Sequence, residues 1–303
     1  MHEKTKIVYF ENARRMTSEV LERYGADTPQ NYFDHLMERS EGLCANTVRM
    51  YKRSVCFALE ESGRADEAEE LRDLFDGVDP PSRGRKLKLV RRVPTRIFER
   101  TLRILRESKS KTSQDAADLL VATAITGLRP SEWAAAEIRG RVLVVQNAKH
   151  SDVRANGPER ELELLDTITA EERSAIERTM ELIRAKGYKT VRPNVSKAFK
   201  DALGSAIKQL GESRWYLRLR LYDFRHQFSA DAKMEWGIGA GMVAAAMGHS
   251  VEDTAVEHYG KRKHGKGGMK VRPSAASIAK VRRLYPVQAP LTPTPGGGAR
   301  MSL

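Results

Sequence analysis

The feature that most restricts the fold of this chain is a short β-rich interruption in an otherwise helical sequence. Residues 141–147 (RVLVVQN) are β-branched and apolar, and residues 159–165 (ERELELL) alternate, as is typical of strands. The polar residues between them predict the turn of a hairpin. Helical periodicity predicts helices at about 94–108, 112–126, 169–185, 194–211, 223–236, 239–247 and 251–259. We therefore predict a mainly α fold with a small β-hairpin or sheet, in the α+β class.

A basic segment separates two parts of the chain. Residues 77–96 begin with glycine and proline and then carry several arginines and lysines without an acidic residue. This composition is typical of a linker between domains. We predict a helical domain at 1–80, a basic linker at 81–95, a second domain at 96–285 and a flexible tail at 286–303.

The first domain has a clear amphipathic helix. Thr28 and Pro29 predict the start of one helix, and in the next, Val48, Tyr51, Val55 and Leu59 fall on one face, with Asn46 or Thr47 as the cap and Gly63 after the end. Arg49, Lys52 and Arg53 lie off that face. These cations suit either a solvated surface or the groove and phosphates of DNA.

The charge of the whole chain favours a polyanionic partner. Lys and Arg number 53 against 40 Asp and Glu, which gives a formal net charge of +13. Nucleic acid is the partner that such an excess most often serves. The two cysteines, Cys44 and Cys56, have no spacing typical of a disulfide framework or zinc site, and no apolar stretch is long enough to span a bilayer. We therefore expect a cytoplasmic protein without a membrane-spanning segment.

Two arginines occupy unusual places for a flexible cation. Arg129 lies between Gly127, which can end a helix in a left-handed cap, and Pro130, which can begin the next one. Glu132 follows in the first turn and could brace the guanidinium group. Arg225 lies in the first turn of a helix that we expect Asp223 to cap, where the helix dipole disfavours a cation unless an anion is present.

Further polar residues occur in a fixed order. Gly248 closes a helix of small residues, His249 comes directly after it, and Tyr259 ends the next predicted helix before a basic run. Together these elements resemble the tyrosine recombinase family, also called phage integrases. That family has a Gly-x-Arg-x-x-Glu turn, a lysine on a β-hairpin, a His-x-x-Arg pair, a Gly-His element and then a tyrosine.

The resemblance covers residues 94–285, and the first domain is similar to the core-binding domain of the family. It implies a C-shaped clamp of two domains around DNA and cleavage through a 3′-phosphotyrosyl intermediate, without metal or cofactor. It also implies the following roles: Tyr259 as nucleophile, Arg129, Arg225 and His249 as ligands of the scissile phosphate, Lys149 as the acid for the leaving oxygen, Tyr222 as a positioning group, and Glu132 and His226 behind them.

Several assignments have alternatives. His150 and Arg154 are close enough to Lys149 to shift the alignment, and Tyr285 is a rival nucleophile without a Gly-His element at the right distance upstream. His226 and His258 are expected to be structural or to support the site from behind. The residues expected to contact DNA are Arg49, Lys52, Arg53, Arg83, Arg85, Lys86, Lys88, Arg91, Arg92, Lys261, Arg262 and Lys263.

The sequence departs from the family pattern at two points. Tyr222 stands where the family usually has histidine, and a phenol is a weak base at neutral pH. His249 and Tyr259 are ten residues apart, one more than the commoner family spacing. The extra residue would turn a helix by roughly 100° but matters little in a loop, and HSVED at 249–253 predicts such a loop.

The resemblance implies a site-specific DNA recombinase, integrase-like, that integrates or excises a mobile element. It would act as a homotetramer on double-stranded DNA and as a monomer in solution, with a DNA-bending accessory protein as a further partner. A type IB topoisomerase or a telomere resolvase shares the same residue set. A DNA-binding accessory protein of the same fold, with catalysis weakened at Tyr222, is the alternative from another class.

Overall fold

The computed structural model describes residues 3–78, 80, 90, 92–148, 157–239, 241–251 and 260–282. The chain divides into two compact units, residues 1–88 and 89–303. The boundary between them falls inside the range 81–95 that the sequence predicts as a linker.

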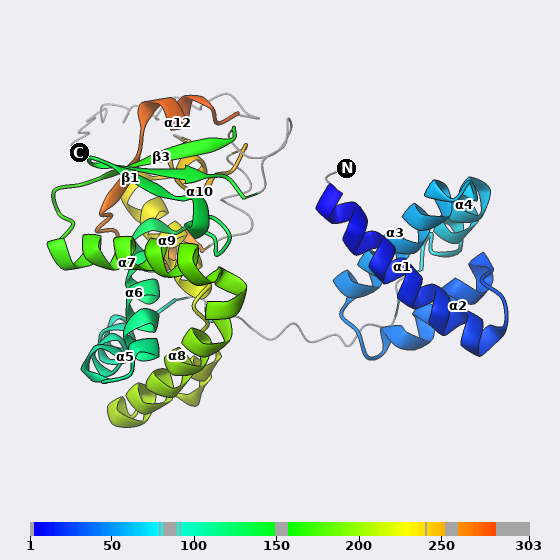
Figure 1. The fold of residues 1–303 in the computed structure, drawn as a ribbon, viewed down its shortest axis with the longest axis horizontal. Coiled ribbons are helices and arrows are strands. Elements are labelled where there is room, and N and C mark those ends of the chain that lie inside the picture. The colour runs from blue at the N-terminus through cyan, green and yellow to red at the C-terminus, as the bar shows by residue number, and fades with distance from the viewer. Residues whose placement is uncertain are drawn as a thin grey trace, which may run out of the picture. The chain divides into compact units, whose positions relative to one another are not determined.

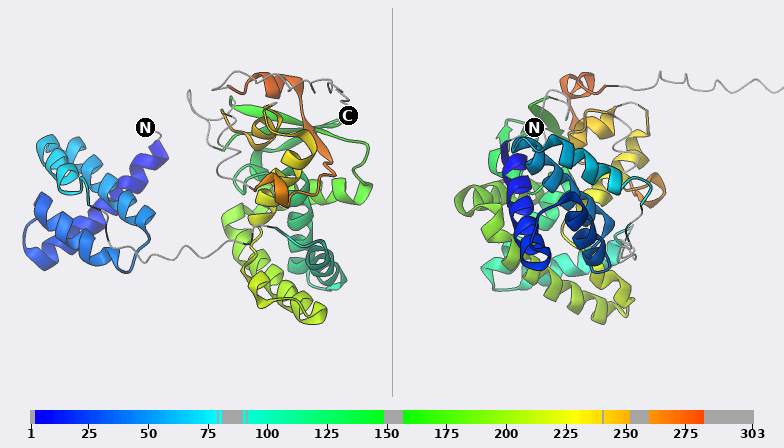
Figure 2. Two further views of the ribbon diagram at one scale, coloured as in Figure 1. Left: turned by 180° about the vertical axis from the view of Figure 1, so that it is seen from behind. Right: turned by 90° about the vertical axis from the view of Figure 1, so that its right-hand side faces the viewer.

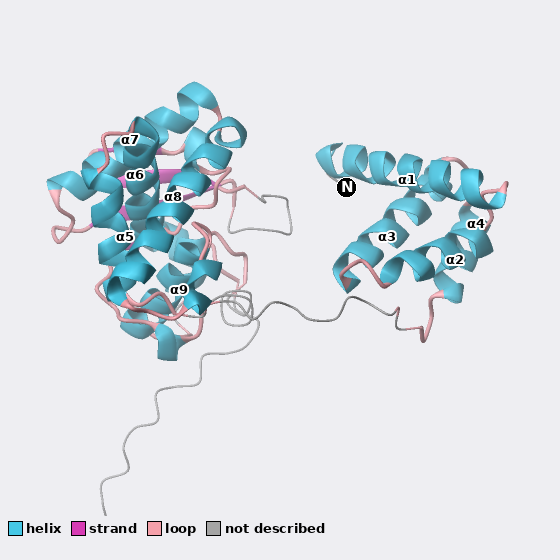
Figure 3. Ribbon diagram, turned by 90° about the horizontal axis from the view of Figure 1, so that it is seen from below, coloured by secondary structure: helices cyan, strands magenta, loops and turns pink. Residues whose placement is uncertain are grey.

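Unit 1 consists, in its described part, of helices joined by short loops (Figure 3). They are α1 (Glu3–Tyr24), α2 (Pro29–Ser40), α3 (Ala45–Glu61) and α4 (Ala65–Leu74). Helix α3 packs against α1 and α4, and α2 packs against α4. The core between them includes Met16, Leu36, Val55 and Leu71. The hydroxyl of Thr28 accepts a hydrogen bond from the Asn31 amide at 3.3 Å, which confirms the predicted start of α2.

The predicted apolar face of α3 is confirmed, because Val48, Tyr51, Val55 and Leu59 are all buried. The predicted cap is wrong. Neither Asn46 nor Thr47 begins the helix, since Cys44 is its N-cap residue and makes no side-chain cap bond. The helix therefore starts earlier than the polar residues suggest.

Unit 2 contains the remaining elements (Figure 1). Its helices are α5 (Thr95–Glu107), α6 (Lys111–Thr126), α7 (Ala170–Lys186), α8 (Tyr188–Leu210), α9 (Asp223–Trp236), α10 (Met242–Met247) and α12 (Ala275–Ala279), with 3-10 turns η1 (Trp133–Ala135), η2 (Arg214–Arg218) and η3 (Arg262–His264). Its strands are β1 (Glu137–Arg139), β2 (Val142–Gln146), β3 (Glu159–Leu164) and β4 (Val271–Pro273).

The strands form one antiparallel sheet in the order β1-β2-β3-β4. Leu143 of β2 lies opposite Leu162 of β3, so the predicted hairpin is confirmed. The outer strands β1 and β4 are too short to stand out in the sequence, and β4 joins the sheet from a distant part of the chain. The protein is thus mainly helical with a small antiparallel sheet, as the α+β prediction requires.

Helix α6 lies at the centre of the helical part of unit 2. It packs against α5, α7, α8 and α9, and most of its residues from Ala116 to Thr126 are buried. The sheet lies at one end of the unit beside α10 and α12, and the long helices extend from the other end (Figures 1 and 2). The C-terminus of α6 therefore delivers the turn at 127–132 to the junction between helices and sheet.

Some helix ends differ from the sequence prediction. Helix α8 begins at Tyr188 and continues through Pro193, whereas the sequence predicts a start near residue 194. Pro193 is the sixth residue of this helix, so it removes an amide that would otherwise bind the carbonyl of Lys189, and the surrounding packing of α8 against α5 and α6 outweighs that loss. Helix α10 begins only at Met242, since Gly241 has a positive φ of 73°. In the described part of the chain, no helix is long and apolar enough to cross a membrane.

Gly127 provides a stability test of the turn that ends α6. Its φ is +63°, and a Cβ there would lie 2.7 Å from Cγ of Phe228. We expect Gly127→Ala to lower the free energy of unfolding by about 3 kcal/mol, through backbone strain plus overpacking. Urea unfolding followed by circular dichroism measures the effect.

Gly211→Ala is the matched control for this substitution. Gly211 ends α8 with a φ of +64°, and a Cβ there would meet nothing within 4 Å. Only the backbone strain of a left-handed alanine remains, so we expect Gly211→Ala to lower the free energy of unfolding by about 1 kcal/mol. Equal losses in the two variants would show that the contact with Phe228 has no energetic weight.

Candidate active site

The turn after α6 holds Arg129 against Glu132. The carboxylate of Glu132 accepts hydrogen bonds from the backbone amide of Arg129 at 2.8 Å and from its guanidinium at 2.7 Å. Glu132 therefore braces this arginine, as the sequence predicts. The expected helix at Pro130 does not form: residues 130–132 are a turn, and only the 3-10 turn η1 comes after it.

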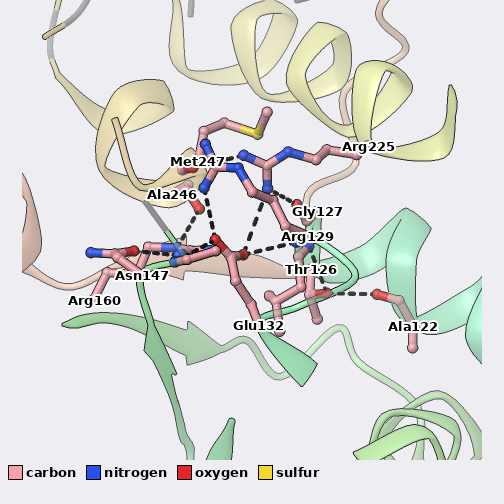
Figure 4. Close-up of polar contacts among 12 residues, drawn as sticks. Ala122, Thr126, Gly127, Arg129, Glu132, Asn147, Arg160, Arg225, Ala246 and Met247 are labelled. Atoms are coloured by element: carbon pink, nitrogen blue, oxygen red, sulfur yellow. Dashed lines mark hydrogen bonds and ion pairs between the residues drawn. The ribbon is translucent and has the colours of Figure 1, made fainter. Parts of the chain in front are cut away.

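A third arginine, Arg160 of β3, binds the same carboxylate. Its guanidinium donates to Oε2 of Glu132 at 2.7 Å, to Oδ1 of Asn147 at 2.5 Å and to the carbonyl of Ala246 at 2.9 Å. Its side chain is fully buried. Figure 4 shows Glu132 between Arg129, Arg160 and Arg225, with Asn147 beside Arg160.

Arg160 is not among the site residues predicted from the sequence, although the sequence contains a signal for it. In the alternating pattern of β3, Arg160 shares the inward face with Leu162 and Leu164, and all three are buried. A cation at an inward position of a strand needs a buried anion or a set of acceptors. That mismatch could have identified it.

Arg225 reaches the cluster from α9. Its guanidinium donates to the carbonyls of Gly127 and Met247, the latter at 2.8 Å, and one nitrogen lies 3.9 Å from Oε2 of Glu132. The predicted cap of α9 is wrong. Tyr222 is the N-cap residue, and the carboxylate of Asp223 instead accepts the amide of Arg220 at 2.8 Å, outside the helix.

His249 comes directly after the left-handed Gly248, which ends α10. The imidazole is buried, with only 4% of the residue exposed. Burial, followed by the positive charges of Arg225, Arg129 and Arg160, lowers its pKa to about 2. The imidazole is therefore neutral at physiological pH and can donate one ring N–H without adding charge to the site.

Glu132 is the counter-charge of the cluster. Burial by itself would raise the pKa of this carboxyl, but the charge and hydrogen bond of Arg160, with the charges of Arg225 and Arg129, lower it well below the ordinary value. Glu132 is therefore ionised. Among the described residues of the cluster, three guanidinium groups face one carboxylate, which leaves an excess of positive charge.

Tyr222 and His226 lie one helical turn apart at the start of α9. Their rings meet edge to face with centroids 5.5 Å apart, and Tyr222 is 38% exposed. Burial lowers the pKa of His226, although Asp223 acts in the opposite direction. A neutral imidazole therefore stands behind an accessible phenol.

Lys149 and Tyr259 lie outside the described residues, as do His150, Arg154, His258 and Tyr285. The ends of the hairpin turn are described. Asn147 joins the two ends of this turn. Its backbone amide donates to the carbonyl of Pro158 and its side-chain amide donates to the carbonyl of Gly157, both at 2.8 Å. The amide of Ala148 donates to Oε1 of Glu132 at 3.5 Å. The stem that precedes Lys149 is thus bound to the arginine cluster.

The chain immediately after Tyr259 is bound along α9. Lys233 donates to the carbonyl of Gly260 at 2.7 Å, and Gln227 donates to that of His264 at 3.0 Å. Asp231 accepts the amide of Lys266 at 2.7 Å, and Glu235 accepts that of Gly268 at 2.5 Å. Four side chains of one helix therefore fix the main chain of residues 260–268.

Gly260 packs directly on α9. A Cβ at this position would lie 2.9 Å from Cβ of Ala230 and would overlap the carbonyl of His226. Lys233, which binds the Gly260 carbonyl, is buried, and burial lowers its pKa to about 8. Lys233 is not among the site residues predicted from the sequence.

The expected DNA contacts fall into three groups. Arg49, Arg53, Arg92, Lys261, Arg262 and Lys263 are exposed. Lys52 is instead half-buried, since its ammonium donates to the carbonyl of Arg72 at 3.2 Å and lies 4.8 Å from the ring centroid of Phe75. The remaining residues, Arg83, Arg85, Lys86, Lys88 and Arg91, lie outside the described part of the chain.

Within the described residues, no group of three or more histidine, cysteine, aspartate or glutamate side chains could hold a metal ion. No protein-family model matches the chain, and no curated protein is significantly similar to it.

Removing the charge of Glu132 tests whether it holds the cluster together. We expect Glu132→Gln to lower the free energy of unfolding at pH 7 by about 3 kcal/mol, because it leaves buried guanidinium groups without a counter-charge. Because the pKa of Glu132 is lowered on folding, its stabilisation is present above the unfolded value of 4.5 and is lost as pH falls through the folded value. Urea unfolding at several pH values should therefore show that the difference in the free energy of unfolding between the wild type and Glu132→Gln becomes smaller in acid.

Glu171→Gln is the control. The carboxylate of Glu171 pairs with Arg178 at the surface and is 56% exposed. Exposed ion pairs contribute less than about 1 kcal/mol, so this variant should unfold close to the wild type. A Glu132→Gln variant as stable as the control would contradict the central role of the buried carboxylate.

Proposed function

We propose that this protein is a site-specific DNA recombinase that cleaves and rejoins DNA through a covalent 3′-phosphotyrosyl intermediate. The observation that carries the proposal is the cluster of Arg129, Arg225 and neutral His249 around Glu132. An excess of buried positive charge, held by rigid turns, is suited to an oxyanion whose negative charge increases during reaction.

The arginines are suited to a phosphodiester. Planar guanidinium groups match pairs of phosphate oxygens better than a lysine does. Arg129 keeps 10% of its side chain exposed, whereas the side chain of Arg225 has no exposure. The phosphate would therefore approach from the side of Arg129, with Arg225 and the ring N–H of His249 completing the clamp.

In the proposed reaction the phenolic oxygen of Tyr259 attacks phosphorus and the bond to the 5′ oxygen breaks. Lys149 donates a proton to that leaving oxygen, and the phenolic proton passes to solvent. The new phosphotyrosyl ester retains the energy of the broken bond, so the 5′-hydroxyl of another strand can reverse the step. No nucleoside triphosphate, metal or other cofactor enters this scheme.

The attachment of residues 260–268 to α9 supports Tyr259 as the nucleophile. The peptide bond holds the Cα atoms of neighbouring residues about 3.8 Å apart. Gly260 packs against His226 and Ala230 of the helix that carries Arg225. Gly260, the residue next to Tyr259, is therefore bound within about two helical turns of Arg225, which is a proposed ligand of the phosphate.

The partner in this proposal is double-stranded DNA in the cytoplasm. Two domains would clamp the duplex, with exposed cations such as Arg49, Arg53 and Arg92 and the run 261–263 on its phosphates. Strand exchange joins two sites, each bound by two protomers, so the active form would be a homotetramer and the protein alone a monomer. A DNA-bending protein would assist, and a mobile element would be the natural substrate.

The same cluster would also serve a type IB topoisomerase or a telomere resolvase. These enzymes share the cleavage step and differ in how the covalent intermediate is resolved. Relaxation of supercoiled DNA without a specific site would favour a topoisomerase, and hairpin products would favour a resolvase. Specific binding without any adduct would favour an accessory DNA-binding protein.

The nucleophile is tested with nicked duplexes that lose a short fragment after cleavage, so that the covalent adduct accumulates. Incubating the purified protein with a pool of such random-sequence duplexes should yield adducts, resolved by denaturing electrophoresis, and sequencing the trapped DNA identifies the site.

We expect Tyr259→Phe to lose the adduct completely, because it lacks the attacking oxygen. Tyr285→Phe is the matched control and should keep it. An adduct that persists in Tyr259→Phe and disappears in Tyr285→Phe would reassign the nucleophile, and no adduct from the wild type would count against cleavage.

Tyr222 is tested by restoring the family residue. Its phenol is exposed and packs on His226, so an imidazole at this place should reach the same space. Because imidazole is a better proton acceptor than a phenol at neutral pH, we expect Tyr222→His to keep or raise the single-turnover cleavage rate. Tyr222→Phe serves as the comparison for loss of the hydroxyl alone. A collapse of cleavage in Tyr222→His would show that the phenol has a role of its own.

A further inference from the structure

Arg160 connects three separate elements of the cluster. Each of its nitrogens binds a different one: Nε binds the carbonyl of Ala246 in α10, one terminal nitrogen binds Asn147 at the end of β2, and the other binds Glu132. The side chain has no exposed surface. All three guanidinium nitrogens of Arg160 are thus engaged by protein groups, so this arginine acts within the protein.

The turn that carries His249 closes directly on Arg160. A Cβ at Gly248 would lie 2.7 Å from a terminal nitrogen of Arg160 and 2.5 Å from Oδ1 of Asn147. Glycine at 248 thus permits the contact as well as the left-handed turn. The guanidinium of Arg160 fixes the distance between the hairpin stem, the histidine turn and the arginine turn.

Arg160 also affects how the negative charge of Glu132 is shared among the arginines of the cluster. Oε1 of Glu132 lies 2.7 Å from Arg129, and Oε2 lies 2.7 Å from Arg160 but 3.9 Å from Arg225. Arg160 is therefore the closer partner of Oε2. Without it, the carboxylate would have only Arg129 and Arg225 to neutralise, and the excess positive charge would fall.

We propose that Arg160 is a positioning residue that takes up the charge of Glu132 and thereby keeps a surplus of positive charge on Arg129 and Arg225 for an oxyanion. The inference rests on the proposed function where it identifies that oxyanion as a DNA phosphodiester. The charge relation itself holds for any tetrahedral oxyanion.

The test is a double-mutant cycle between Arg160 and Glu132. Arg160→Met removes one positive charge, and Glu132→Gln in the same chain removes the negative charge that it balanced. Tungstate is the probe, titrated calorimetrically into the wild type, both single variants and the double variant at constant ionic strength. This probe requires no knowledge of the DNA site.

We expect Arg160→Met to weaken tungstate binding by at least about tenfold, because a positive charge close to the anion is lost in a medium of low effective dielectric constant. The double variant should return to within about threefold of the wild type, because it restores the net charge of the cluster. A purely structural role predicts the opposite sign, since a second substitution would then weaken binding further.

The double variant also protects the test against misfolding. Replacing a buried ion pair with neutral groups is often harmless, whereas removing one partner is destabilising. If Arg160→Met alone does not fold, the double variant decides the matter, because its loss of tungstate binding would overturn the proposal. Arg178→Met is the matched control: it breaks a bidentate pair with Asp118 outside the cluster and should leave tungstate affinity unchanged.

Failure of this inference differs from failure of the recombinase proposal. If the wild type binds tungstate but forms no DNA adduct, cleavage is contradicted. The tungstate affinities of the variants still decide whether Arg160 has the proposed role. A wild type that forms the adduct, with Arg160→Met binding tungstate as tightly, overturns only the role of Arg160. No tungstate binding by the wild type would overturn the inference directly.

Discussion

One buried carboxylate holds the candidate site of this protein together. Glu132 meets Arg129, Arg160 and Arg225, which come from a turn, a strand and a helix far apart in the sequence. Burying a charge is costly unless it is paired and hydrogen-bonded, so these elements depend on one another. The two oxygens of Glu132 cannot neutralise all three cations. Among the described residues, the structure therefore gathers more positive than negative charge at this point.

Helix α9 is the second organising element. It contributes Arg225 to the cluster, Tyr222 and His226 at its start, and the side chains that bind residues 260–268 further along. One rigid helix thus relates the arginine cluster to the chain immediately after Tyr259. Site geometry built on a helix is held more accurately than geometry built on loops.

Local sequence rules predicted the parts of the fold that depend on neighbours in the chain. The hairpin, the left-handed end of α6 at Gly127 and the bond between Arg129 and Glu132 all result from spacing. The alternation of β3 places Arg160 among inward-facing residues, but its partners are 13 to 86 residues away and no local pattern indicates which groups they are. Lys52 was assigned to the surface because Phe75 and Arg72, its actual contacts, belong to the next helix and its end. The short strands β1 and β4 exist only through long-range pairing.

The burial of His249 has a consequence for the conditions under which the protein works. An ordinary histidine gains a proton as the medium is acidified between about pH 8 and 5. His249, with a pKa lowered to about 2, keeps one protonation state throughout that interval. As long as no anion is bound beside it, the hydrogen-bonding character of this imidazole therefore does not change when the medium is acidified within that interval.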